Sequence, residues 1–305
     1  MNKINFKCIS NIKEAEIAWK QLSPLKSIYD DWDFRYCYYK FFQYPLFFYA
    51  GFDKNELIGL LPLMWNEEKG YLDFFAGFSY MEDNAIFIKR GYEKYYNNFL
   101  ECIDRPALLE YMRPDMKLLN NSVIQDFNYS VNLKSLRSYA DFIYLYLGKN
   151  TAKKLFSQFK KIQKLGVKII YDRFDDLSLL VYWNKVKFGA NSSFYERPHW
   201  ETFIKTITKK YPSKIISVEI NKKVEGVGLV IFYNNICYGI NSGYNPTINN
   251  LGKYITMLKI DAGIKARATT YDAGSGSFGW KEDFHLLKKP QYQLDLRSKY
   301  ITWHL

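Results

Sequence analysis

The order of secondary-structure elements predicted from the sequence repeats in the two halves of this 305-residue chain. Each half reads as two helices, three strands joined by short turns, another helix and a further strand. The segments FFYAGFDKNELIGLLPL (47–63) and IISVEINKKVEGVGLVI (215–231) overlay without a gap, and one more residue of offset aligns Gly59 with Gly228. Any two hairpins share some of this likeness, but the common order indicates a duplicated domain. We expect an α/β protein with α+β mixed sheets and domains at residues 1–135 and 136–305.

Apolar periodicity and turn residues set the expected boundaries of the elements. In the first half we expect helices at 12–22, 28–42 and 92–103, and strands at 45–51, 57–65, 71–76 and 107–111. In the second half we expect helices at 152–165, 176–188, 198–209 and 252–266, and strands at 167–171, 214–220, 224–233, 236–242 and 269–273.

The balance of charged side chains is basic, with 43 Lys and Arg against 31 Asp and Glu and a net charge of +12. Such a charge is compatible with binding to nucleic acid or another polyanion. The chain is also rich in Lys, Asn, Ile, Tyr and Phe, whose codons are A/T-rich. Base composition of the gene is therefore the favoured explanation, because net charge by itself does not determine fold or activity.

The four cysteines are far apart in the sequence, and none has C-x-x-C spacing. With three histidines in the chain, this distribution argues against a zinc site, and we expect no metal. Scattered thiols suit a reducing compartment. The longest apolar run, nine residues at 57–65, contains Pro62, whereas a membrane span needs about twenty residues. The first residues become charged before an apolar segment forms, so we expect no signal peptide, no membrane span and a cytoplasmic location.

Residues 274–279, GSGSFG, match the glycine pattern of nucleotide-binding loops. A dinucleotide fold needs a helix and an acidic residue about twenty positions further on, and a kinase needs its catalytic loop downstream. Only 26 residues follow Gly279, and they include Pro290. A P-loop needs Gly-Lys-Ser/Thr, but Gly279 is followed by Trp280 and Lys281. All three nucleotide-loop interpretations are excluded, and we expect 274–279 to be a turn that returns Lys281 toward the strand bearing Asp272.

The residues around this turn resemble a known family. The run GYNPTINNLGKYITMLKIDAGI precedes a strand ending in YDAG, and GWKEDF follows it. This order is similar to that of acetyltransferases of the CelD-like and FemAB-like branch of the GNAT superfamily, with gy-x-p…pG-x-x-l, a helix, and D-x-G…YK-x-x-f. Trp280 departs from the pattern, since the family usually has Tyr before the Lys. The matching residues are Gly243, Tyr244, Pro246, Gly252, Asp272, Gly274, Lys281 and Phe284.

The resemblance extends over residues 19–296 and includes the basic segment KNTAKKLFSQFKKIQKLGVKI and the apolar segment LIGLLPLMW. It implies tandem GNAT-like domains, of which the C-terminal one is active. In GNAT proteins the loop before the helix that follows the strand meander holds the pyrophosphate of coenzyme A, which implies acetyl-CoA or another acyl-CoA as co-substrate. A helix N-terminus favours an anion, although an ordinary helix start explains the same residues. The corresponding residues are Asn249, Asn250, Leu251, Gly252, Lys253 and Tyr254.

Acyl transfer to an amine needs a base, a donor to the tetrahedral oxyanion and an acid for the leaving group. Asp272 and Lys281 are the leading candidates because they follow a strand end, where functional residues collect. Tyr238 and Tyr244 flank the strand before the anion loop, where a phenol can protonate a leaving thiolate, and Glu219 lies on a hairpin strand. An ion pair explains Asp272 and Lys281 equally, and most of the 27 tyrosines serve packing.

Three functions remain open. The first is an N-acyltransferase that uses acyl-CoA and a small-molecule or cell-envelope precursor amine as acceptor, with residues 190–200 lining the acceptor pocket or capping a helix. The second is an aminoacyl-tRNA-dependent transferase, in which AKKLFSQFKKIQK contacts the tRNA backbone. The third is a non-catalytic binding module that retains the fold. The order of residues gives no support for a Ser-His-Asp hydrolase.

Overall fold

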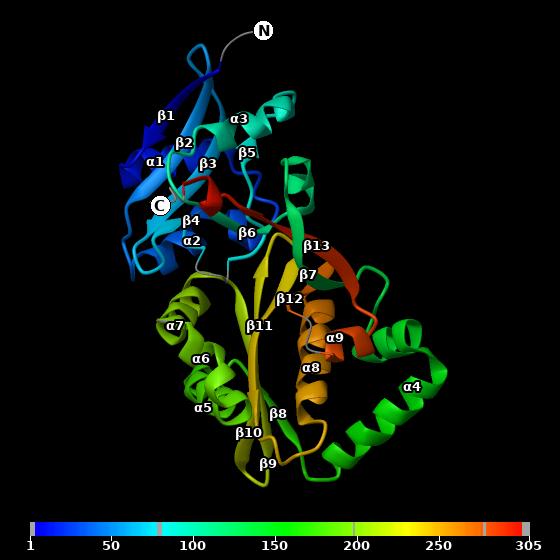
Figure 1. Ribbon diagram of the computed structural model, residues 1–305. Helices are drawn as coiled ribbons and strands as arrows, with labels where there is room; N and C mark the ends of the chain where they lie inside the picture. The colour runs from blue at the N-terminus through cyan, green and yellow to red at the C-terminus, as the bar shows by residue number, and fades with distance from the viewer. Residues whose placement is uncertain (1–3, 78–80, 198, 277–278, 301–305) are drawn as a thin grey trace. The chain divides into compact units, whose positions relative to one another are not determined.

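The computed structural model describes residues 4–77, 81–197, 199–276 and 279–300 (Figure 1). Their contacts divide the chain into two compact units, residues 1–127 with 289–305, and residues 128–288. Residues 289–305, assigned from the sequence to the second domain, thus belong to the first unit. The reason is that β13 (Leu287–Asp295) pairs antiparallel with β6 (Leu108–Met112).

The first unit has an antiparallel sheet in the order β1-β2-β3-β4, with β5 paired to β3. Its strands are β1 (Asn5–Ile9), β2 (Leu46–Asp53), β3 (Glu56–Asn66), β4 (Tyr71–Phe74) and β5 (Phe87–Ile88). Its helices are α1 (Ile12–Leu22), α2 (Trp32–Tyr39) and α3 (Tyr96–Glu101). The helix expected at 28–42 begins later, because the Asp31 side chain accepts from the N–H groups of Asp33 and Phe34 and caps α2.

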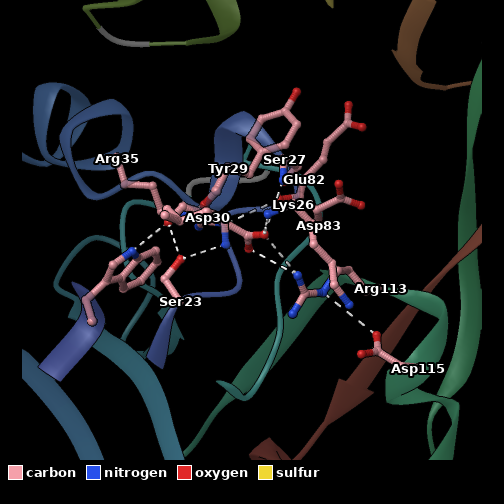
Figure 2. A network of polar contacts seen from close by, with 12 residues as sticks. Ser23, Lys26, Ser27, Tyr29, Asp30, Arg35, Glu82, Asp83, Arg113 and Asp115 are labelled. Carbon is pink, nitrogen blue, oxygen red and sulfur yellow. Dashed lines mark hydrogen bonds and ion pairs between the residues drawn. The ribbon is translucent and has the colours of Figure 1, made fainter. Parts of the chain in front are cut away.

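Three charged side chains, of which Asp30 and Arg35 are buried, connect distant segments of the first unit (Figure 2). Arg35, 2% exposed, donates from Nε to the Tyr29 carbonyl at 2.6 Å, and from its two Nη atoms to the carbonyls of Phe75 (2.9 Å) and Glu82 (3.2 Å). Asp30 is fully buried and pairs with Arg113 at 3.1 Å. Burial lowers the pKa of Arg35 to about 10, so its charge persists at neutral pH.

Asp73 on β4 is a buried carboxyl group that lacks a full set of partners. Its Oδ1 accepts from the Phe74 N–H at 2.8 Å, whereas Oδ2 has no hydrogen-bond partner among the described residues. Burial, followed by the charge of Glu110, raises the pKa of Asp73 to about 7. The protonated form therefore prevails in the folded protein below neutral pH.

This pKa predicts a pH-dependent stability. A carboxyl group whose pKa rises from about 3.9 to about 7 on folding stabilises the fold fully below pH 4, and that contribution is lost as pH rises through 7. The free energy of unfolding, measured with urea from pH 5 to pH 8, should decline by up to about 1.4 kcal/mol per pH unit. The Asp73→Asn variant should not show this decline. Asp115→Asn, at an exposed position, should leave the decline in place. If the free energy of unfolding changed with pH in the same way in the protein and in Asp73→Asn, the raised pKa of Asp73 would be contradicted.

The second unit has a mixed sheet in the order β7-β12-β11-β10-β9-β8, in which β11 and β12 are the parallel pair. Figure 1 shows α5, α6 and α7 on one side of this sheet and α8 and α4 on the other. The strands are β7 (Val123–Asn132), β8 (Lys168–Tyr171), β9 (Ser213–Ile220), β10 (Lys223–Tyr233), β11 (Ile236–Tyr244) and β12 (Thr270–Ser275). The helices are α4 (Tyr139–Gln163), α5 (Leu177–Phe188), α6 (Ser193–Glu196), α7 (Trp200–Lys210), α8 (Leu251–Lys265) and α9 (Trp280–Asp283).

The two glycines aligned from the sequence occupy corresponding places in the two units. Phe99 of α3 packs on Gly59 of β3, where an added Cβ would lie 2.4 Å from the ring. Ile255 and Lys259 of α8 pack on Gly228 of β10, where an added Cβ would lie 2.8 Å and 3.2 Å from them. In both units the helix after the meander therefore approaches the second meander strand closely, which supports the predicted duplication.

Candidate active site

The parallel strands β11 and β12 separate after a short paired stretch. Their register joins three residue pairs and ends at Tyr238 with Asp272. Beyond this pair β11 continues to Tyr244 through a bulge between Gly239 and Asn241, while β12 pairs irregularly with β7. Among the described residues no strand pairs with the β12-facing edge of β11 past Tyr238. Backbone groups along this edge can therefore hydrogen-bond to an extended ligand.

Asp272 and Tyr238 are neighbours at this point of divergence. The Asp272 carboxylate accepts a hydrogen bond from Asn128 Nδ2 at 3.0 Å and from the Gly274 N–H at 2.7 Å. Tyr238 is buried and is the register partner of Asp272, so both side chains lie on one face of the sheet. A carboxylate-bearing and a phenol-bearing residue are thus adjacent across the two strands where these part.

Lys281 lies at the same end of β12, as predicted, although the strand continues through Gly274 and Ser275, which were expected in the turn. It is 2% exposed, and its Nζ donates to the carbonyls of Gly274 and Ser275, both at 2.7 Å. The Nζ also lies 4.9 Å from the centre of the Tyr129 ring. Lys281 therefore fixes the end of the strand that bears Asp272 through backbone carbonyls. Phe278, which alternates with Trp280 about Gly279 in the sequence and is expected to pack on the same side, lies outside the described residues.

The start of α8 combines cationic and hydrogen-bonding groups. Asn250 precedes the helix in the left-handed conformation (φ 66°), and Leu251 and Tyr254 are buried, so their side chains belong to the core. A Cβ on Gly252 would lie 2.4 Å from the Tyr244 ring and 2.7 Å from its hydroxyl oxygen. The space that Gly252 leaves is therefore filled by Tyr244, whose hydroxyl lies at the first turn of α8. Burial raises the pKa of this phenol.

Two further positions in the predicted loop are polar. Lys253 Nζ lies 3.9 Å from Asp283 Oδ2, and Asn249 is exposed. A Gly252→Asp change, which would place a side chain and a negative charge at this helix N-terminus, would also displace the Tyr244 ring. Lys253 is accordingly the cleaner position at which to test an anion at this helix terminus.

Glu219 does not join this group. It lies on β9, two strands from β11, and its Oε2 is 3.8 Å from Arg173 Nη1. Residues 190–200 reach β11 instead at Asn241, which donates to Ser193 Oγ at 3.1 Å and accepts from Trp200 Nε1 at 3.1 Å. Ser192 caps α6, as the capping alternative holds.

Asn128 and Tyr129 are site residues that the sequence does not identify, because no strand is predicted for β7. The only local signal is the alternation that buries Tyr129 and Val131. Within the described ranges no cluster of His, Cys, Asp and Glu could hold a metal ion. None of the described helices combines the length and apolar character that crossing a bilayer requires.

No family model matches the sequence, and no curated protein matches it. Solved structures do match in fold. The chain is similar to a FemX structure (TM-score 0.61, 9% identity, 97% of this chain and 98% of that one). It is also similar to L-PGS from Bacillus licheniformis (TM-score 0.59, 8% identity, 96% and 94%). A tandem GNAT protein from the clavulanic acid biosynthesis pathway matches with TM-score 0.55 and 7% identity over 96% and 98%. The protein therefore has the α/β fold of tandem GNAT-like proteins, in the form shared with FemX and L-PGS.

Proposed function

We propose that the second unit transfers an acyl group from an activated carrier to an amine. The proposal depends mainly on one observation. Tyr238 and Asp272 are neighbours where β11 and β12 separate, and Lys281 binds the end of β12 at the same place. An acyl chain lying along the open edge of β11 would bring its carbonyl carbon to these groups. GNAT-like structural neighbours support the same reaction class, a transferase.

The chemistry follows from the roles that the groups can fill. The amine attacks the acyl carbonyl carbon, and the Asp272 carboxylate accepts the proton that the nitrogen loses. The Lys281 ammonium, held beside the strand end, stabilises the negative charge on the tetrahedral oxygen. The carbonyl then re-forms, and the Tyr238 phenol protonates the leaving thiolate or alkoxide.

Acyl-CoA is the donor that we propose first. The N-terminus of α8, the Tyr244 hydroxyl at Gly252 and the Lys253 ammonium form a set of donors and positive charge suited to a pyrophosphate. A specific observation also favours a second donor, an aminoacyl-tRNA. Residues 142–171 contain seven lysines and no Asp or Glu.

The lysines of α4 are exposed. Among the described residues none of them has an ion-pair partner, whereas Lys205 and Lys265 on α7 and α8 pair with acids one turn away. The exposed face between Lys149 and Lys164 carries Lys, Asn, Thr, Ser and Gln side chains, while the apolar residues of the same segment are buried or half-buried. A polar cationic face of this kind suits a phosphate backbone better than a bilayer.

The two donors can be separated by binding measurements on the full chain with acetyl-CoA and with charged tRNA. For a CoA donor we expect acetyl-CoA to bind and Lys253→Glu to weaken it about tenfold, since a charge is reversed at a helix N-terminus. The triple variant Lys153→Glu, Lys160→Glu, Lys161→Glu should leave that affinity unchanged. For a tRNA donor, the slope of the logarithm of the tRNA binding constant against the logarithm of the salt concentration should become shallower in the triple variant. The expected change is about one unit for each lysine replaced. A protein that binds neither ligand would support the non-catalytic alternative.

A further inference from the structure

A pocket lies in the first unit, lined by the end of α1, by β5 and by the start of α3. Its volume is about 330 Å³, within the range of small-molecule sites. Leu22, Pro24 and residues 86–88 form the apolar part of its lining. All the lining residues belong to the first unit, so the pocket does not depend on the candidate active site of the second. The polar part of the lining consists of Lys26, Arg90, Glu93, Tyr96, Arg113 and Asp115.

Arg113 is the most buried cation of this lining, with 11% of its side chain exposed. Its Nη1 donates to both oxygens of the fully buried Asp30, at 3.1 Å and 3.2 Å (Figure 2). Its Nε is buried and has no hydrogen-bond partner among the described residues. Asp115 Oδ1 lies 3.8 Å from Nε, which is too far for a hydrogen bond. Buried donors without an acceptor are rare in folded proteins, so this edge of the guanidinium calls for a bound acceptor.

The charges of the lining favour a ligand with one negative charge. Three cations stand against two carboxylates, which leaves one positive charge in excess. Lys26 and Arg90 are exposed, and neither forms an ion pair with a residue that the structure describes. Glu93 Oε2 accepts a hydrogen bond from the Gly91 N–H at 2.8 Å, so this carboxylate already has a partner. A phosphate monoester would bring close to two negative charges, more than the lining balances.

Tyr96 adds a neutral donor to the pocket. It is 7% exposed, and burial, followed by the charge of Asp115, raises its pKa to about 12. Its hydroxyl is therefore protonated at neutral pH and can donate to an anion. The charges of Arg113 and Glu93 act on the same phenol, so the polar groups lie near one another around one space.

The apolar wall adjoins the guanidinium. Ile86 and Phe87 are buried, and Arg113 Cζ lies 6.0 Å from the centre of the Phe87 ring. An anion beside Arg113 would therefore have apolar side chains next to it. An inorganic anion would leave this part of the pocket unused, whereas an organic anion would bury apolar surface there.

We propose that this pocket binds a small organic carboxylate that bears an apolar chain or ring. The carboxylate accepts hydrogen bonds from the Arg113 guanidinium and the Tyr96 hydroxyl, and the apolar group packs on residues 86–88. The two oxygens of a carboxylate match the adjacent N–H groups along one edge of a guanidinium. Asp115, whose side chain is half exposed, turns toward solvent when the ligand pairs with Arg113. Binding here does not depend on acyl transfer by the second unit.

The test uses hexanoate and phenylacetate as probes, with hexanamide and phenylacetamide as neutral analogues of the same shape. Ligand-observed NMR titration of the full chain should give each carboxylate at least about a tenfold advantage over its amide, the range of a charge-assisted hydrogen bond. Both carboxylates should also bind at least about tenfold more tightly than acetate, because each buried methylene contributes about fourfold.

Three variants locate the binding. Tyr96→Phe should weaken both carboxylates about fivefold, the scale of one hydrogen bond. Arg113→Lys keeps a charge beside Asp30 but removes the planar fork, so the advantage over the amides should be lost. Tyr96→Phe leaves the Asp30 ion pair intact and tests the pocket even if Arg113→Lys does not fold. The control Lys94→Met, at an exposed position outside the lining, should leave every affinity unchanged.

Each contrary result overturns a different part of the proposal. If neither carboxylate binds, or if carboxylates and amides bind equally, the pocket is not an anion site. If acetate binds as tightly as the larger carboxylates, the apolar wall has no role. Carboxylate affinities that are unchanged in Tyr96→Phe would place the binding outside this pocket. Titration with acetyl-CoA tests the second unit separately, so the two proposals can fail independently.

Discussion

Replacing Lys281 by Met is expected to lower turnover about a hundredfold or more, the scale of losing one group that stabilises an oxyanion. The structure adds an effect on stability that the sequence does not reveal. Because Lys281 Nζ donates to the Gly274 and Ser275 carbonyls in a buried place, the variant leaves two acceptors without a charged donor. Each loss costs about 1–3 kcal/mol, so the melting temperature should fall as well. Turnover with the donor identified by titration, measured well below the melting temperature, separates the two effects.

Lys288 provides the matched control for Lys281. Its Nζ lies 5.6 Å from the centre of the same Tyr129 ring and 3.6 Å from Glu282, but its side chain is half exposed. Lys288→Met should change turnover and stability little, because exposed ion pairs contribute about 0–1 kcal/mol. Unchanged turnover in a folded Lys281→Met protein would reduce Lys281 to a structural role and remove it from the mechanism.

Replacing Arg35 by Met is expected to produce the largest loss of stability in the first unit. The guanidinium donates to carbonyls of three segments, at Tyr29, Phe75 and Glu82, and the side chain is almost completely buried (Figure 2). Removal of one partner from a buried charged network costs about 3–5 kcal/mol. Urea unfolding of the two proteins should show a difference of this size in the free energy of unfolding.

Arg90→Met is the control for Arg35→Met, because Arg90 belongs to the same unit and is exposed. Exposed substitutions away from caps and networks typically change stability within about 0.5 kcal/mol. A loss below about 1 kcal/mol for Arg35→Met would mean that water or neighbouring side chains satisfy the three carbonyls, and that the buried charge does not hold the segments together.

Local patterns in the sequence were sufficient for the helix, meander and helix order in both halves and for the return of Lys281 toward the strand of Asp272. The hairpin at residues 47–63, the meander at 214–242 and the helix at 252–266 depend on side-chain periodicity and turn residues, which are properties of neighbours in the chain. The sequence does not predict β1, β5, β7, the short helices α6 and α9, or the first part of α4. β1 and β7 have few buried residues in their patterns, and α4 continues through a non-helical Gly148.

The sequence by itself determined the duplicated α/β architecture and the position of Lys281, because periodicity, turns and the offset between aligned glycines are encoded locally. Only the tertiary structure decided which candidates meet. Strand order places Glu219 two strands from β11, and side-chain packing puts Tyr244 against Gly252. Helix–sheet contact buries the Lys259 side chain, although in the sequence it is one lysine among many. Pairing between distant strands and the choice of face are non-local, so no window of the sequence contains them.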